Sequence, residues 1–121
     1  ISIVRKDATG NGGDIIINTP VLSLSNFAQL ATTTLGQGNA GNITIHATES
    51  ISLSQNSILQ AMTVGQGNAG KITIDAQEAI FSLDGSGTGI TNSIGAVLGL
   101  IGSGQGGDIN ITAKSLNLTN G

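Results

Sequence analysis

Glycine-rich segments that could bind a nucleotide are the first feature of this sequence that suggests chemistry. The spacing GxGxxG occurs three times, at Gly36, Gly38 and Gly41, at Gly65, Gly67 and Gly70, and at Gly102, Gly104 and Gly107. A dinucleotide site needs this motif to follow a strand and to open a helix whose N-terminus receives the pyrophosphate. Here the last glycine instead opens an Ile-x-Ile segment that is typical of a strand. We therefore interpret these glycines as residues of tight turns that require φ > 0.

The same segments match two other ligand-binding loops in part. GQGNAGK at 65–71 fits a phosphate-binding loop as far as Lys71, but Ile72 stands where a Ser or Thr would bind magnesium. Gly-Gly-Asp ends at Asp14 and again at Asp108, as in calcium-binding glycine and aspartate repeats, but those repeats need a nine-residue period. We expect neither a metal site nor a bound cofactor from these segments.

Side chains that could act in acid–base catalysis are few. Glu49 and Glu78 occupy the same place in two neighbouring repeats, and paired carboxylates can cleave glycans. The basic and aromatic side chains that would complete such a groove are missing. His46 is the only histidine, and it is expected to be solvated on the outer surface. We predict no catalytic residue and no enzyme, and we keep a carbohydrate-binding or carbohydrate-cleaving β-helix as an alternative.

Composition excludes several further classes of protein. The 121 residues include 4 Lys or Arg, 7 Asp or Glu, 2 Phe, and no Tyr, Trp or Cys, and the net charge is −3. Such a chain lacks the basic patch and the stacking rings that nucleic acids require. It has no disulfide framework, and no apolar run approaches the roughly 18 residues of a membrane-spanning helix. Gly, Ile, Thr, Ser and Asn dominate instead, which favours strands and turns over helices.

An internal repeat determines the expected fold. GQGNAGNITI at 36–45 recurs as GQGNAGKITI at 65–74, with weaker copies at 10–17 and 104–111. The last glycines of the four copies are 28, 29 and 37 residues apart, and they are Gly13, Gly41, Gly70 and Gly107. A period near 29 residues indicates a supersecondary unit that stacks on copies of itself.

Each repeat contains three short segments in which aliphatic and polar residues alternate, as in strands with one buried face. The spacings between these segments are the same in the two middle repeats, which favours parallel strands stacked in register. We therefore predict an all-β fold, a parallel β-helix (solenoid) of about four coils of 28–29 residues with three strands in each coil. Its interior ladder is expected to consist of Ile15, Ile17, Ile43, Ile45, Ile72, Ile74, Ile109, Ile111, Leu24, Leu53, Leu83 and Leu118.

The 37-residue spacing predicts an insertion at about residues 84–95, in a turn lengthened by the sequence DGSGTGITNS. A further residue is inserted between Ile74 and Phe81. Residues 94–102 then form the most apolar stretch, with Ala96, Leu98 and Leu100 expected on the inner face. Val97 and Ile101 would face outward, and they are either a lateral contact surface or are covered by the long turn.

The repeats resemble those of large bacterial exoproteins of the filamentous haemagglutinin type, which are secreted by the two-partner route. The resemblance rests on GQGNAGNITI, the alternating SISLS that follows it and the Leu-x-Ala-x-Thr after that, and it covers nearly the whole chain. It implies a right-handed β-helical shaft, extracellular or on the outer bacterial surface, that acts in adhesion, aggregation or matrix formation. It implies no catalytic site and assigns no individual binding residue.

We expect residues 1–121 to form one β-helical segment inside a longer solenoid. Ile1 and Ile3 are assigned to a third strand and Leu118 to a second strand, so the two ends are in phase. A self-assembling filament subunit that stacks end to end is therefore a further alternative. The expected partners are neighbouring coils or further copies, and host or cell-surface glycans or proteins, without nucleic acid and without membrane insertion.

Overall fold

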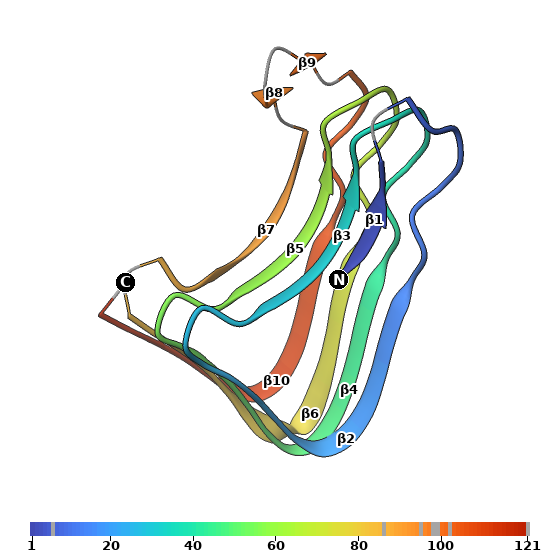
Figure 1. Cartoon of the computed structure of the whole chain (residues 1–121). Helices are drawn as coiled ribbons and strands as arrows, with labels where there is room; N and C mark the ends of the chain where they lie inside the picture. Colours follow the sequence, from blue (N-terminus) through green and yellow to red (C-terminus); the bar gives the residue numbers. More distant parts are fainter. Residues whose placement is uncertain (6, 86, 95, 98–99, 102, 121) are drawn as a thin grey trace.

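Strands provide the regular structure of this protein in the computed structural model (Figure 1). The structure describes residues 1–5, 7–85, 87–94, 96–97, 100–101 and 103–120, with the backbone alone described for those between 91 and 101. No helix in these ranges is long and apolar enough to span a membrane. The strands are β1 (Ser2–Val4), β2 (Ile15–Leu24), β3 (Gln29–Thr34), β4 (Ile43–Ser54), β5 (Ile58–Thr63), β6 (Ile72–Asp84), β7 (Gly89–Ile94), β8 (Ala96–Val97), β9 (Leu100–Ile101) and β10 (Ile109–Thr119).

Two parallel sheets of four strands each enclose the core. One has the order β1-β3-β5-β7 and the other β10-β6-β4-β2, so each strand pairs with the equivalent strand of the next repeat. The two sheets face one another in Figure 1, and buried side chains from both of them form a single hydrophobic cluster. The prediction of an all-β protein with parallel strands is confirmed for the described residues.

The pairing register aligns equivalent positions of successive repeats. In the long-stranded sheet Ile15 pairs with Ile43, Ile43 with Ile72, and Ile72 with Ile109. In the other sheet Leu30 pairs with Leu59. Because paired strands lie about 4.8 Å apart, side chains of the same kind are stacked directly on one another.

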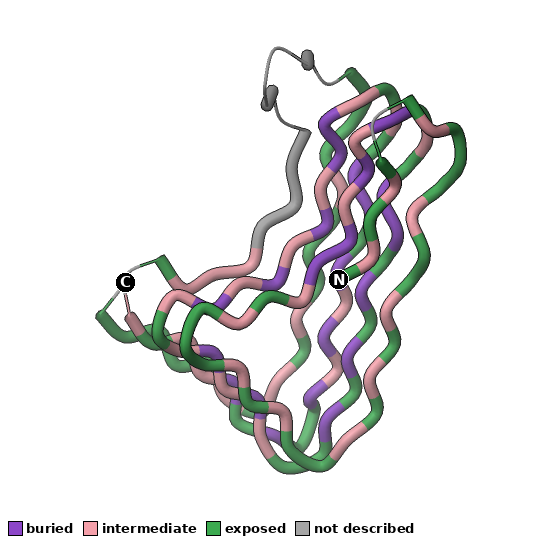
Figure 2. The backbone as a smooth tube through the Cα atoms, viewed as in Figure 1, coloured by how far each residue is buried: buried purple, intermediate pink, exposed green. Residues whose placement is uncertain are grey.

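Burial alternates along the strands of the middle repeats, as Figure 2 shows. Ile45 is fully buried while its neighbour Thr44 is exposed, as expected from the period-two pattern. The buried members of the predicted ladder are Ile43, Ile45, Leu53, Ile72 and Ile74. The half-buried members are Ile15, Ile17, Leu24, Leu83 and Ile111. Ile109 and Leu118 are 41% and 65% exposed, because β10 is the outermost strand of its sheet.

The predicted division of each coil into three strands requires a correction. The first two segments form one continuous strand, since β4 contains both Ile45 and Ile51. The register shifts between His46 and Ser50, where β6 has one residue more than β4, and this confirms the extra residue expected before Phe81. A local irregularity of this kind bends a strand without ending its hydrogen-bonded ladder.

The predicted position of the insertion, residues 84–95, is correct for only one inserted residue, which lies between Asp84 and Gly89. β7 pairs with β5 from Gly89 opposite Ile58 to Ile94 opposite Thr63, so these residues continue the ladder. The next paired position is Ser103, opposite Gln66. Two residues lie between Thr63 and Gln66, but eight lie between Ile94 and Ser103, so the other six inserted residues fall within residues 95–102.

Within this range, residues 96–97 and 100–101 form an antiparallel pair rather than a ladder strand. β8 pairs with β9 in antiparallel fashion, with Ala96 opposite Ile101 and Val97 opposite Leu100, and the pair lies apart from both sheets in Figure 1. Ala96 and Leu100 therefore do not continue the inner ladder. Alternating apolar residues suit a hairpin as well as a parallel strand, which explains the error. Leu98 and the side chains of Val97 and Ile101 lie outside the described part of the chain.

The inner face of the first strand also differs from the prediction. Ser2 pairs with the buried Thr32, whereas Ile3 pairs with Thr33 on the other face. Ile1 and Ile3 are accordingly 70% and 55% exposed. The hydroxyl of Ser2 accepts a hydrogen bond from the backbone N–H of Gly13 at 3.1 Å, which favours this register. A shift of one residue exchanges the two faces of a strand, so the predicted phase of the two ends does not hold.

Candidate functional site

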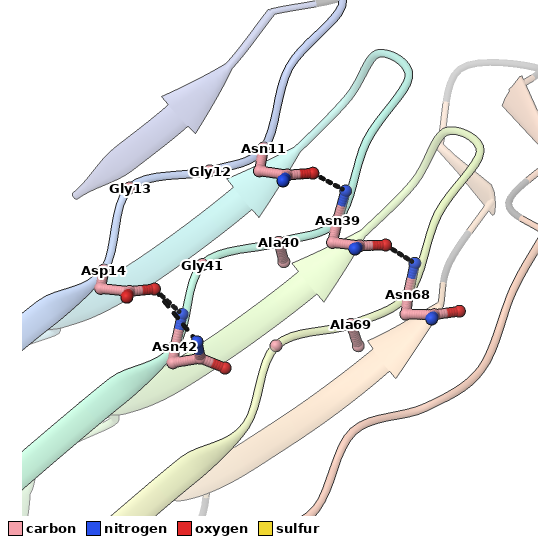
Figure 3. A pocket seen from close by; sticks show the side chains of 11 residues that line it. Asn11, Gly12, Gly13, Asp14, Asn39, Ala40, Gly41, Asn42, Asn68 and Ala69 are labelled. Carbon is pink, nitrogen blue, oxygen red and sulfur yellow. Dashed lines mark hydrogen bonds between the residues drawn. The ribbon is translucent and has the colours of Figure 1, made fainter.

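A polar trough crosses three stacked glycine-rich segments on the outside of the protein (Figure 3). The trough has a volume of about 600 Å³. We call it the asparagine trough, and its lining consists of Asn11, Gly12, Gly13, Asp14, Asn39, Ala40, Gly41, Asn42, Asn68, Ala69 and Gly70. The segments stack because each one connects a strand of one sheet to a strand of the other in every repeat.

One wall of the trough is a row of asparagines whose orientation is fixed by hydrogen bonds. The side-chain oxygen Oδ1 of Asn11 accepts from the backbone N–H of Asn39 at 2.9 Å, and Oδ1 of Asn39 accepts from that of Asn68 at 2.8 Å. Oδ1 of Asn68 accepts in turn from the N–H of Gln105 at 2.9 Å. Each oxygen thus points to the next repeat, and the amide nitrogens of the three asparagines lie on the same side of the row (Figure 3).

A second row lies three residues further along the chain. Oδ1 of Asp14 accepts from the backbone N–H of Asn42 at 2.7 Å and from its side-chain Nδ2 at 3.2 Å. Oδ1 of Asn42 accepts from the N–H of Lys71 at 2.9 Å. Asp14 and Lys71, which suggested calcium and phosphate loops in the sequence, therefore occupy equivalent positions in this row. In the described ranges no group of three or more His, Asp or Glu side chains is placed to hold a metal ion.

The floor of the trough explains why its glycines are needed. A Cβ atom on Gly70 would lie 1.9 Å from the carbonyl oxygen of Gly41, and one on Gly41 would lie 2.2 Å from that of Gly13. Gly41 and Gly70 are therefore required by the close approach of successive backbones, and the prediction of φ > 0 is wrong for these two glycines but is confirmed for the middle glycine of each motif. The positive φ occurs at the preceding glycine of the motif, with values of 137° at Gly38 and 143° at Gly67.

Buried threonine side chains donate hydrogen bonds to the backbone that forms the floor of the trough. The hydroxyl of Thr32 donates to the carbonyl oxygen of Gly41 at 2.6 Å, and that of Thr34 donates to the carbonyl oxygen of Asn39 at 3.0 Å. Thr63 makes the equivalent contact to Asn68 one repeat later. The sequence places Thr32 on an inner face but does not reveal this role. The available signal was a Thr two residues before the first glycine in both middle repeats, Thr34 and Thr63.

A second polar feature on the outer face is formed by His46 and Asp75. The ring nitrogen Nδ1 of His46 lies 3.3 Å from Oδ2 of Asp75, and the two side chains are 51% and 41% exposed. The sequence predicts no fixed partner for His46, but the pairing register of β4 and β6 places Asp75 opposite it. Glu78 lines the same hollow of about 210 Å³, whereas Glu49 does not, so the structure does not bring the two glutamates into one pocket.

The His46–Asp75 pair has part of the geometry of a proton-transfer site. A carboxylate at Nδ1 orients an imidazole, and a candidate base must also reach the proton that it removes. The second oxygen of Asp75, Oδ1, is buried and has no hydrogen-bond partner in the described part of the structure. Because no other described residue that lines this hollow completes a catalytic constellation, we rank it below the asparagine trough as a site.

A third cluster joins the end of β10 to the end of β6. Oδ1 of Asp84 accepts from the side-chain Nδ2 of Asn120 and from the hydroxyl of Thr119, both at 2.9 Å. The bond from Asn120, followed by that from Thr119, lowers the pKa of the Asp84 carboxyl below its ordinary value. The three residues of this cluster are exposed, and their hydrogen bonds join the ends of the two strands, so we call the cluster the clasp.

Comparison with known proteins does not assign this arrangement to any family. No protein-family model, no curated protein and no solved structure matches the chain. The trough, the His46–Asp75 pair and the two sheets are therefore interpreted from their own geometry.

Proposed function

We propose that the chain is a segment of a right-handed parallel β-helix (solenoid) that serves as a structural shaft. We place this shaft in a secreted bacterial adhesin or extracellular fibre that acts in adhesion, aggregation or matrix formation. The observation that carries the proposal is the stacking of equivalent isoleucines, Ile15, Ile43, Ile72 and Ile109, in one parallel register. The likeness of the repeats to filamentous haemagglutinin-type exoproteins supports the adhesin role.

The hydrogen bonding and the packing of the stacked repeats suit a structural shaft. Each repeat adds a layer whose backbone hydrogen bonds run along the stacking axis, and the asparagine rows add side-chain bonds in the same direction. The interior is filled mainly by aliphatic side chains, which form one hydrophobic cluster that continues through successive layers. Length can therefore be increased by repetition without a change in the local energetics, as in other repeat proteins.

Insertion of whole repeats tests the shaft directly. Ten added copies of residues 43–71 should lengthen the particle by about 48 Å, because each layer adds about 4.8 Å. Electron microscopy of the purified chain measures the length of the rods. Particles that grow in all directions, or that do not lengthen, would refute the solenoid. A separate assay, the attachment of cells that display the chain, tests adhesion and can fail without affecting the rod.

End-to-end contact is a second candidate, and a specific observation favours it. Leu116 and Leu118 point to the inner side of β10 but are 47% and 65% exposed. An apolar hollow of about 270 Å³ beside them is lined in part by Leu83 and Thr88. A further coil, from the same chain or from another copy, would cover this surface. Sedimentation of the chain at rising concentration tests whether another copy covers this surface. If copies assemble in this way, Leu118→Lys should abolish the concentration-dependent assembly.

A further inference from the structure

We propose that the asparagine trough binds one strand of a neutral polysaccharide that lies along the stacking axis. The proposal goes beyond the shaft role, because it assigns a ligand class to a surface that a purely mechanical shaft would not need. It also gives a specific location to the carbohydrate-binding alternative raised by the sequence. It includes no cleavage step.

The wall of the trough presents hydrogen-bond donors at a regular interval. Because Oδ1 of Asn11, Asn39 and Asn68 is occupied by the backbone N–H of the next repeat, the orientation of each amide group is fixed. Their Nδ2 groups are therefore held in one direction and repeat at about the 4.8 Å spacing of the layers. Fixed donors lose little conformational freedom on binding, so a ligand with regularly repeated oxygen acceptors is favoured.

The shape of the trough suits a flat chain of sugar rings. The two rows are three residues apart, which corresponds to a width of about 10 Å along an extended backbone. Ala40 and Ala69 are only 6% and 8% exposed, and Gly41 and Gly70 have no side chain, so the floor is mainly peptide backbone. Nothing projects from this floor to block a linear ligand that spans several layers.

The charge of the lining selects a neutral polymer. Asp14 is the one ionisable residue among the eleven that line the trough, and its Oδ1 is already held by Asn42. Lys71 continues the second row beyond the lining and balances the charge of Asp14, so no excess positive charge favours an anionic polysaccharide. Amide and carboxylate groups can exchange hydrogen bonds with sugar hydroxyls, which both donate and accept.

Nuclear magnetic resonance with cellohexaose as the probe tests the proposal on the intact chain. Addition of this neutral glucan should shift the side-chain NH₂ signals of Asn11, Asn39 and Asn68 and leave those of Asn18, on the exposed face of β2, unchanged. Heparin, an anionic probe, should not produce these shifts. Absence of shifts with cellohexaose and with a second neutral glucan, laminarihexaose, would overturn the proposal, as would shifts produced by heparin alone.

A matched pair of variants separates binding from folding. Asn39→Asp combined with Asn68→Asp keeps an oxygen acceptor for the next repeat, as Asp14 does in the native chain, but removes two NH₂ donors. We expect this variant to lose about tenfold or more in affinity, because each lost hydrogen bond weakens binding severalfold. Thr44→Asp adds a charge to the exposed face of β4 and should bind cellohexaose like the native chain. Equal affinities for both variants, with native melting curves, would contradict the proposed site.

Discussion

The hydroxyl of Thr32 donates a hydrogen bond of 2.6 Å to the carbonyl oxygen of Gly41, and this bond is buried in the interior of the protein. Thr32 is fully buried, and Gly41 belongs to the glycine-rich segment that forms the floor of the asparagine trough. One interior contact therefore ties a strand of the first sheet to the segment that enters the second. The stability of the coil and the shape of the trough depend on the same bond.

Replacement of this hydroxyl should measure its contribution. Thr32→Val keeps the volume but leaves the Gly41 carbonyl without its hydroxyl donor, and we expect a loss of about 1–3 kcal/mol in the free energy of unfolding. Thr34→Val should cost less, because the carbonyl of Asn39 also accepts from the backbone N–H of Gly12. Urea unfolding gives both values. Thr44→Val on the exposed face is the control, and an equal loss there would argue against a specific role for Thr32.

Close approach of the backbones predicts a strong effect of a single methyl group at Gly70. Gly70→Ala would place its Cβ 1.9 Å from the carbonyl oxygen of Gly41, and backbone cannot move aside as a flexible side chain does. We expect a loss of about 3 kcal/mol or more in unfolding free energy. Gly106→Ala is the matched control, since nothing lies within 4 Å of its added Cβ. Thermal melts of similar midpoint for the two variants would show that successive repeats are not in such close contact.

The inner and outer faces of β4 predict opposite responses to a charge. Ile45→Asp buries a carboxylate among aliphatic side chains with no partner, and we expect a loss of about 4 kcal/mol or more, enough to prevent folding. Thr44→Asp, one residue away, faces solvent and should change stability by about 0.5 kcal/mol or less. Circular dichroism distinguishes the two. If both variants unfolded alike, the assignment of faces would be incorrect.

The interior of the protein was readable from the sequence because it repeats. Ile43 and Ile72 follow identical glycine-rich segments 29 residues apart, and parallel pairing in register is the arrangement that buries both. The same reasoning failed at β7, where Asn92 pairs with Ala61. A polar residue at a ladder position breaks the expected alternation, so the sequence predicts a lengthened turn here and an insertion that begins before most of the inserted residues.

The polar contacts could not be predicted from composition or period. The bond from the N–H of Asn68 to Oδ1 of Asn39 requires that the two residues lie one layer apart, which only the register establishes. The His46–Asp75 contact depends on the same register, because the residues are 29 positions apart in the sequence. Alignment of the repeats places His46 and Asp75 at equivalent positions, but it does not reveal that their side chains are in contact.

The clasp at Asp84 predicts a specific dependence of stability on pH. Hydrogen bonds from Asn120 and Thr119 lower the pKa of the folded carboxyl below 3.8, its ordinary value. A carboxyl whose pKa is lower in the folded state stabilises the protein fully above the unfolded pKa, and this contribution is lost as the pH falls through the folded pKa.

Asp84→Asn retains an oxygen acceptor but removes the titration. The difference in unfolding free energy between native chain and variant should therefore be constant from pH 7 to about 5 and should fall in more acidic solution. A carboxyl titration midpoint for Asp84 at or above 3.8, followed by nuclear magnetic resonance, would show that the clasp does not form in solution.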